Sequence, residues 1–377
     1  MEHILITADI VPTTTNYSDF ATGNIQKLVG NDLMQVFSDS SFTIMNLETP
    51  LTDKLSPIEK CGPCLHAPTN TVNGLKEINP FFYTLANNHI MDQNEDGLKA
   101  TIQTLEESGI QFAGVGENIS EACKPFQKKI GEKNIGIYCC VEHEFSIATD
   151  KTFGANPYDP LFSYDHVKEL KNEVDYIIVL YHGGKEQYRY PSPRLQQICR
   201  KFIDSGADLV VCQHSHCIGC EEKYDNGSIV YGQGNFLFDL DDNEYWNTGL
   251  VIELELGENI DIKYIPIEKH GAGVRLANNP EKILAGFYER SKHVGDKGFL
   301  EQQYSKFALE ALSDYEQHML GKLGRNIFFR AINKLTGYKL ANKYYSKEDL
   351  LALQNYFMTE AHSELVIEAI KTELKRR

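Results

Sequence analysis

Short apolar runs recur along the first two thirds of the chain, and each is followed by a polar turn that contains Gly or Asn. They occupy residues 3–8, 42–47, 81–86, 135–140, 176–181, 209–212 and 229–231. Runs this short and this rich in Ile, Val, Phe and Tyr predict buried strands. Helix-like stretches at 97–108 and 193–205 lie between them. Strands that alternate with helices predict an α/β core, and residues 250–256 and 260–267 are expected to form a hairpin at its end.

The pattern changes beyond about residue 280, where strand-like runs stop and helical periodicity takes over. We therefore predict two parts, a core domain at 1–275 and a helical appendage at 276–377. The clearest helical patterns of the appendage cover residues 281–290, 300–322 and 349–375. No internal repeat accompanies them.

A basic segment lies inside the predicted appendage. Between Glu316 and Glu348 no acidic residue occurs, whereas seven lysines and arginines do. Apolar residues recur there at helical spacing, at Leu323, Ile327, Ala331 and Leu335. One interpretation is an interfacial helix that binds anions or a membrane surface. The other is a helix packed on the acidic body with its basic face in water, which is the commoner use of an amphipathic helix.

The distribution of charge restricts the classes of partner. The formal net charge is −16 at pH 7, and the acidic excess lies before Arg275, because the remainder is slightly basic. Nucleic-acid binders draw their affinity from neutralising phosphates, so this acidic body argues against a nucleic-acid partner. A small anionic substrate or a polyanionic polymer would have to be attracted by local cations or by metal ions.

The hydropathy pattern bears on location. No apolar stretch reaches eighteen residues without a charge, which argues against a membrane-spanning helix. The first ten residues have the pattern of a strand and lack the basic and apolar regions of a signal peptide. We therefore expect a cytoplasmic protein, with peripheral contact to a membrane left open, and nine mostly reduced cysteines.

Residue types that bind metals directly follow five of the predicted strands. Their side chains are Asp9, Glu48, Asn88, His89, His182, His214 and His216. In open α/β sheets, ligands gather beyond the carboxyl ends of the strands, so five such ends can surround one point. Imidazole and carboxylate ligands together suit zinc, manganese or iron. One histidine after one strand is usually structural, but five strand ends with ligand-type residues predict a metal site.

With these motifs the chain resembles the CapA/PgsA-type capsule synthesis (poly-γ-glutamate capsule) family, a branch of the calcineurin-like metallophosphoesterase superfamily. The matching text comprises Ala8-Asp9, Asn46-Leu47-Glu48, Leu85-Ala86-Asn87-Asn88-His89 with Asp92, Gly97-Leu98, Gly109-Ile110, Gly114-Val115-Gly116-Glu117-Asn118, His182-Gly183-Gly184 with Glu186, His214-Ser215-His216 and Gly234-Asn235-Phe236. It covers about residues 3–270 in the family's order. The resemblance implies a four-layer α/β/β/α sandwich, here with a C-terminal helical extension.

The resemblance also implies roles for individual residues. One divalent ion would be held by Asp9 and His216, a second by Asn88, His182 and His214, and both by the bridging Glu48. His89 would remain off the metals and serve as the general acid or as an electrophile at the developing charge, and Asp92 completes the predicted catalytic pair. Val11 stands where the wider superfamily has a further histidine ligand, so either one ion or two are expected. Gln213 and Gly183 also depart from the usual glycine and tryptophan.

A further group of residues is expected to contact the substrate: Asn46, Asn87, Glu186, Arg189, Arg194 and Asn235. Arginine suits bidentate recognition of carboxylate or phosphate groups. A solvated loop explains the charged residues that follow His182 equally well.

Two C-x-x-C motifs occur, Cys61-Gly62-Pro63-Cys64 and the pair Cys217/Cys220. The first lacks the strand and tryptophan context of a redox active site. Together the four thiols could bind a structural zinc ion, but unpaired thiols are the simpler interpretation.

We predict a divalent-metal-dependent hydrolase that acts on an anionic ester or amide, either a phosphoester or a polyglutamate-type substrate. The first alternative is a non-hydrolytic role in capsule or poly-γ-glutamate biosynthesis, in which residues 317–347 contact a membrane surface or a synthase. The second is a metal-assisted epimerase or isomerase with a histidine base. The sequence names neither substrate, metal nor oligomeric state, because one scaffold hosts many chemistries.

Overall fold

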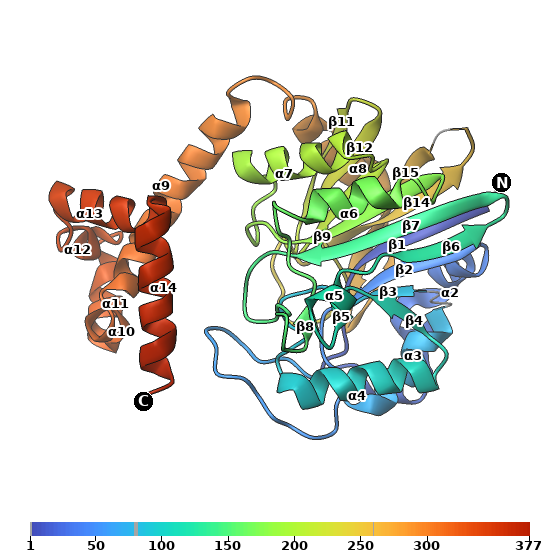
Figure 1. The fold of residues 1–377 in the computed structure, drawn as a ribbon, viewed down its shortest axis with the longest axis horizontal. Helices are drawn as coiled ribbons and strands as arrows, with labels where there is room; N and C mark the ends of the chain where they lie inside the picture. Colours follow the sequence, from blue (N-terminus) through green and yellow to red (C-terminus); the bar gives the residue numbers. More distant parts are fainter. Residues whose placement is uncertain (1, 79–81, 259) are drawn as a thin grey trace. The chain divides into compact units, whose positions relative to one another are not determined.

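A computed structural model describes residues 2–78, 82–258 and 260–377, and two mixed sheets form its core (Figure 1). The strands of the first sheet are β1 (Glu2–Val11), β2 (Phe42–Leu47), β3 (Phe82–Thr84), β4 (Gln111–Ala113), β13 (Asn235–Phe238), β14 (Thr248–Leu256), β15 (Ile260–His270) and β16 (Gly273–Leu276). Their order is β16-β15-β14-β1-β2-β3-β4, with β13 paired to β1. Strands β1 to β4 run parallel, whereas β14, β15 and β16 are joined antiparallel.

The second sheet is also mixed. Its strands are β6 (Phe126–Ile130), β7 (Lys133–Val141), β9 (Tyr176–His182), β10 (Leu209–Gln213), β11 (Ile218–Tyr224) and β12 (Gly227–Gln233), in the order β11-β12-β10-β9-β7-β6. The four central strands are parallel, and the two edge strands are antiparallel to their neighbours. A small two-stranded sheet joins β5 (Val115–Gly116) to β8 (Gly154–Ala155).

Alternating side chains of the second sheet separate two apolar cores. On β9, Ile178 and Leu180 belong to the core shared with β1 and β2, whereas Ile177 and Val179 face α6 (Ser163–Leu170) and α7 (Pro193–Asp204). Successive side chains of a strand point to opposite faces, so this strand is covered on both sides. The two helices lie over the outer face of this sheet (Figure 1).

Further helices pack on the first sheet. They are α1 (Tyr17–Ala21), α2 (Ile25–Ser38), α3 (Val72–Leu75) and α4 (Asn94–Glu107), with short turns at Thr69–Thr71 and Lys76–Ile78 and α5 (Ile119–Ala122) beside β5. Leu33 and Phe37 of α2 and Leu98 and Leu105 of α4 join the core of this sheet. Helix, sheet, sheet and helix therefore form the four layers that the sequence predicted, and the α/β/β/α sandwich is confirmed.

The strand predictions hold in most places. The run at 42–47 forms β2 with those bounds, and the hairpin predicted at 250–267 is the antiparallel pair β14 and β15. The run at 81–86 shortens to β3, and its first residue lies outside the described part of the chain. The sequence missed β4, β5, β6, β8, β11, β13 and β16, most of which are short or lie at a sheet edge.

The chain divides into two compact units, the first of which ends at Glu301. Helix α8 (Pro280–Ser291) belongs to this unit because it packs on β11 and β15. The first unit thus extends beyond the predicted boundary at residue 275 by that helix and the turn after it.

The second unit, from Gln302 to Arg377, is helical in the described structure. Its helices are α9 (Phe299–Met319), which starts in the first unit, α10 (Lys322–Arg325), α11 (Ile327–Leu335), α12 (Lys339–Asn342), α13 (Lys347–Met358) and α14 (Glu360–Leu374). The pattern predicted as one helix at 349–375 is broken at Thr359. Among the residues described, no helix combines the length and the apolar character that crossing a membrane requires.

Candidate metal centre

Strand register brings polar side chains together at one end of the sheets. Asp9 of β1 lies opposite Asn46 of β2 on one side and Asn235 of β13 on the other. His182 ends β9 opposite Gln213 of β10, and the next residues carry His214 and His216. The buried cluster comprises Asp9, Asn46, Glu48, Asn87, Asn88, His89, Asp92, His182, His214, His216 and Asn235.

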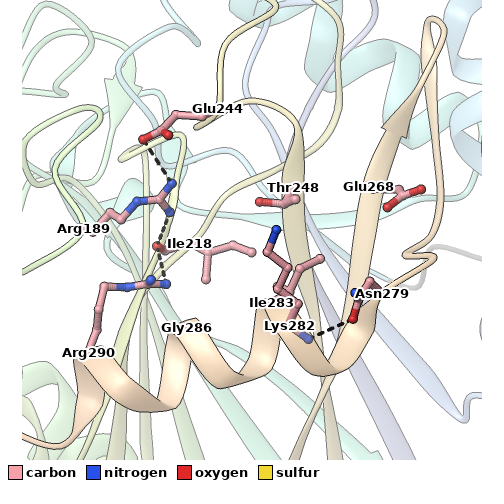
Figure 2. A pocket seen from close by; sticks show the side chains of 10 residues that line it. All are labelled: Arg189, Ile218, Glu244, Thr248, Glu268, Asn279, Lys282, Ile283, Gly286 and Arg290. Atoms are coloured by element: carbon pink, nitrogen blue, oxygen red, sulfur yellow. Dashed lines mark hydrogen bonds and ion pairs between the residues drawn. The ribbon is translucent and has the colours of Figure 1, made fainter.

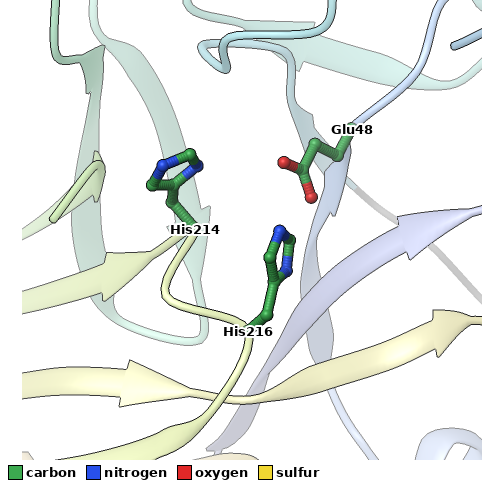
Figure 3. A group of neighbouring side chains, drawn as sticks. All are labelled: Glu48, His214 and His216. Atoms are coloured by element: carbon green, nitrogen blue, oxygen red, sulfur yellow. The ribbon is translucent and has the colours of Figure 1, made fainter. Parts of the chain in front are cut away.

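Glu48 is the most unusual member of the cluster. It is fully buried, and in the described structure neither carboxylate oxygen has a hydrogen-bond partner. Its ligand atom and those of His214 and His216 all lie within 4.8 Å of one another, and Figure 3 shows the three side chains converging. His182 Nε2 lies 3.3 Å from Glu48 Oε1, which is an ion-pair distance without hydrogen-bond alignment. A buried carboxylate without a donor is costly, so a cation fits this position well.

Asp9 lies beside His216, a member of this group. His216 Nδ1 is 3.6 Å from Asp9 Oδ2 and 2.9 Å from Asn235 Oδ1, and Asn46 Nδ2 donates to Asp9 Oδ1 at 2.7 Å. Burial alone would lower the pKa of His216, but the Asp9 and Glu48 carboxylates raise it to about 9. Burial likewise opposes the charge of Asp9, yet His216 and His182 hold the pKa of Asp9 below its ordinary value.

On the other side of Glu48, His182 and His214 lie with their ring centroids 4.9 Å apart. His182 Nε2 is 3.0 Å from Asn88 Oδ1. Burial, followed by the neighbouring His182 and His216, holds the pKa of His214 well below its ordinary value. A neutral imidazole is the form that binds a metal ion, so His214 is ready to act as a ligand.

The backbone at the two last histidines is unusual. His214 has φ = 90° and His216 has φ = 51°, both in the left-handed region. Residues other than glycine adopt this region at a cost of roughly 1–2 kcal/mol. Such outliers cluster at functional sites, where the surrounding structure holds them in place.

His89 is held by a carboxylate that has several partners of its own. His89 Nδ1 lies 2.6 Å from Asp92 Oδ2, and the backbone amide of Leu65 donates to the same oxygen at 2.6 Å. The side chain of Lys60 is only 2% exposed. It forms an ion pair with Asp92 and places Nζ 3.3 Å from His89 Nδ1. Asp92 therefore engages Nδ1, and Nε2 is the ring nitrogen left for a substrate. The sequence did not indicate Lys60.

Two carboxylates near the cluster were also missed. Glu142 and Glu144 follow β7, with carboxylate oxygens 3.8 and 4.0 Å from His214 Nε2. The three ligand atoms form a second candidate metal group. Asn88 Nδ2 donates to Glu144 Oε2 at 3.3 Å, and burial raises the pKa of Glu142. The rule that singled out the other strand ends would have found both residues, because they follow the predicted strand at 135–140.

Some predicted residues lie elsewhere. Glu186 is exposed in the loop after His182, and Arg194 lies in the first turn of α7. Arg189 Nη1 donates to the carbonyl of Ile218 at 3.0 Å and lines a separate hollow beside α8. Asn46 and Asn87 contact each other and the cluster, with Asn87 Nδ2 donating to Asn46 Oδ1 at 3.1 Å.

The cysteines are free thiols in the described structure. Cys61 is exposed, whereas Cys217 and Cys220 are buried. The third candidate metal group found in the described ranges joins His3 to two glutamates of β14, and none of the three groups includes a cysteine. The structure thus favours unpaired thiols over a shared zinc site.

The structure is thus a four-layer α/β sandwich with a candidate metal centre of imidazoles, amides and carboxylates gathered at its strand ends. The sequence model described as bacterial capsule synthesis protein PGA_cap matches residues 3–240, and the chain belongs to this family.

Curated relatives agree with this family. The PGA biosynthesis protein CapA of Bacillus subtilis is 30% identical over 213 residues, which cover 54% of this chain and 55% of that protein. The capsule biosynthesis protein CapA of Bacillus anthracis is 28% identical over 211 residues, covering 53% of this chain and 51% of that protein. The chain thus spans about half the length of the curated relatives it matches.

Two solved structures align with most of this chain. A hypothetical protein of Thermus thermophilus aligns with 71% of this chain and 100% of its own, at a TM-score of 0.47 and 12% identity. A novel phosphatase of Mycoplasma pneumoniae aligns with 74% of this chain and 96% of its own, at a TM-score of 0.44 and 13% identity. Neither TM-score reaches 0.5, so the activity proposed below does not rest on these structures.

Proposed function

We propose that the protein is a divalent-metal-dependent hydrolase that acts on an anionic ester or amide, either a phosphoester or a polyglutamate-type substrate. One observation carries the proposal: the buried Glu48 carboxylate has no donor in the described structure and faces His214 and His216. Burying an ionised group without hydrogen bonds costs on the order of several kcal/mol, and a bound cation would offset that cost.

The ligand assignment follows the two halves of the cluster. The ligand atoms of Glu48, His214 and His216 lie within 4.8 Å of one another, with Asp9 beside His216. Asn88 and His182 extend the set on the other side, and Glu142 and Glu144 stand near His214. This donor set, imidazole nitrogen with carboxylate and amide oxygen, suits manganese, zinc or iron. Either one ion or two can be accommodated by these ligands.

A bound divalent ion would act as a Lewis acid on the phosphoryl or acyl oxygen of the substrate. The protein itself would supply a proton through His89, since Asp92 holds Nδ1 and leaves Nε2 to face the leaving group. General acid catalysis of this kind contributes on the order of 10²–10⁴-fold. Asn46 would act as a positioning residue, because its amide donates to Asp9 and lies 3.2 Å from His182 Nδ1.

The test combines metal content with activity. We expect the purified chain to contain a divalent metal and to hydrolyse a chromogenic phosphodiester or a γ-glutamyl amide with added manganese. His182→Ala should abolish both the bound metal and the hydrolysis. His293→Ala is the matched control, since this exposed histidine pairs with Asp296 on the surface. The absence of bound metal and of hydrolysis with manganese, zinc or iron would refute the proposal.

A second candidate function is a non-hydrolytic accessory role at a membrane surface. Within the basic segment at 317–347, Ile327, Phe328 and Leu335 of α11 are 75%, 76% and 86% exposed. Exposed apolar side chains beside lysines and arginines suit the surface of an anionic bilayer. The names of the two Bacillus relatives also concern biosynthesis.

Vesicle sedimentation distinguishes this candidate. Full-length protein should sediment with vesicles that contain phosphatidylserine but not with neutral vesicles, and the double substitution Ile327→Ser/Phe328→Ser should abolish sedimentation. Leu309→Ser, at an exposed apolar residue outside the basic segment, serves as the control. Equal recovery of wild type and double variant would exclude the membrane contact.

A further inference from the structure

A hollow of about 500 Å³ lies beside α8, on the side of the first unit formed by β11 and the loops before β14. Its lining includes Arg189, Lys282 and Arg290 together with Glu244 and Glu268 (Figure 2). None of these residues belongs to the buried cluster of the candidate metal centre. Three cationic side chains around one cavity are notable on a chain with a formal charge of −16.

The two arginines are fixed side by side by the same backbone carbonyl. Arg189 Nη1 and Arg290 Nη2 both donate to the oxygen of Ile218, at 3.0 and 3.1 Å. Arg290 Nε also donates to the carbonyl of Gly219 at 2.8 Å. Two guanidinium groups held this close repel each other, and burial followed by the neighbouring Arg189 lowers the pKa of Arg290. The remaining N–H donors are therefore preorganised for a ligand with negative charge.

The two carboxylates near the hollow offset only part of the charge of its three cationic side chains. Glu244 is 74% exposed and reaches Arg189 only at 3.8 Å, so water screens the pair. Glu268 is engaged by the side chain and backbone of Asn278. Lys282 extends its ammonium group into the hollow (Figure 2), and no ion pair of Lys282 or Arg290 occurs within the described ranges.

We infer that this hollow is an anion-binding site in which Arg189, Arg290 and Lys282 take a carboxylate or phosphate group of a small-molecule ligand. The planar fork of arginine matches both groups, and charge-assisted hydrogen bonds to them are the stronger kind. The shared chemistry is an oxyanion with two or more acceptor atoms. Binding at this site does not depend on the proposed hydrolase activity.

Tyr245 and Trp246, adjacent in the chain, contact one residue of the hollow and one residue of the candidate metal centre. Arg189 stacks over the ring of Tyr245 at 4.8 Å, and the next residue, Trp246, stacks on His216 at 4.8 Å between ring centroids. Two residues that are adjacent in the loop before β14 therefore contact Arg189 of the hollow and one proposed metal ligand.

Calorimetric titration of the full-length chain tests the inference, with inorganic phosphate and glutarate as probes. The protein is first treated with EDTA and then desalted, so that the probes meet neither metal at the cluster nor a competing polycarboxylate in the buffer. We expect saturable binding of at least one probe, weakened about tenfold by Lys282→Gln, since one charge-assisted hydrogen bond contributes on this order. Arg189→Gln should weaken it at least as much. Binding of phosphate alone assigns a phosphoryl group, and binding of glutarate alone assigns a carboxylate.

Lys292→Gln is the matched control, because it removes the same charge at the end of α8 from an exposed lysine that pairs with Glu289. This variant should bind the probes as tightly as the wild type. Circular dichroism confirms that each variant is folded, and Lys282→Gln keeps the backbone contacts of Arg290. Absence of binding to the wild type, or equal weakening by Lys282→Gln and Lys292→Gln, overturns the inference.

Discussion

Replacing Glu48 with Gln should raise the free energy of unfolding of the metal-free protein and lower that of the metal-bound protein. In the metal-free protein, the substitution removes a buried charge whose oxygens lack donors in the described structure. Leaving a buried polar group unsatisfied costs about 1–3 kcal/mol. The gain falls at the lower end of this range, because His182 and His216 lose a neighbouring negative charge. We expect the metal-free variant to be more stable by about 1 kcal/mol, or about 2 °C in Tm for a unit of this size.

With metal present, the order should reverse. A ligand that binds only the folded state stabilises it by about 2.7 kcal/mol at a hundredfold excess over its Kd. The wild type should gain this amount when manganese is added, whereas Glu48→Gln should gain little, because it loses the carboxylate that faces His214 and His216. Thermal unfolding followed by circular dichroism, in EDTA and in excess manganese, measures both differences.

Glu222→Gln provides the matched control. Glu222 is a buried glutamate that has partners, since it accepts hydrogen bonds from Arg200, Gln196 and Tyr231. Its substitution should lower Tm in both buffers by a similar amount. If Glu48→Gln behaves like this control, with equal destabilisation in EDTA and in manganese, Glu48 is a structural carboxylate and the argument for the metal centre fails.

Three further predictions concern other parts of the fold. Lys60→Met leaves the buried Asp92 without its cation and should lower the free energy of unfolding, measured in urea, by about 3–5 kcal/mol. Adding Asp92→Asn should restore part of this loss. No recovery in the double variant would contradict the pairing. Burial raises the pKa of Asp239, but hydrogen bonds from Lys269 and Thr15 outweigh burial and hold this pKa below 3.8. The contribution of Asp239 to folding stability is therefore present above pH 3.8 and is lost as the pH falls through the folded pKa. Asp239→Asn should therefore flatten the acid side of the stability profile, and an unchanged profile would refute this. The exposed Cys61 should react with a thiol reagent in the native protein, whereas Cys199, whose pKa burial raises, should react only after denaturation; mass spectrometry of the labelled peptides distinguishes them.

The sequence predicts the meeting of Asp9, Glu48, His182 and His214 for a simple physical reason. Each follows or ends an apolar run, and the carboxyl ends of parallel strands share an edge of the sheet, which places Asp9 near Glu48 and His182 near His214. The two pairs lie in different sheets, and their meeting follows from the sandwich that the family resemblance implies. The strand-end argument applied equally to Glu142, which was overlooked although it follows a predicted strand.

Other features depend on loop paths that periodicity does not encode. Lys60 lies 32 residues before Asp92 in an irregular segment, and only the fold brings the two together. Arg189 follows His182 closely in sequence, yet the intervening loop turns through left-handed residues at Gly184 and Gln187, and the guanidinium ends beside α8. Nearness along the chain was a poor guide to nearness in space here.

The left-handed backbone at His214 and His216 would give a bound metal ion a second role. A chain under pressure only to fold could place glycine in this turn, as it does at Gly232 and Gly234 with φ of 104° and 81°. Instead, histidine occupies both positions, although residues with a side chain disfavour the left-handed conformation. An ion bound by both rings would hold the turn in this conformation. Removing the ion with a chelator should therefore speed amide hydrogen exchange in this turn, while the amides of β10 remain protected.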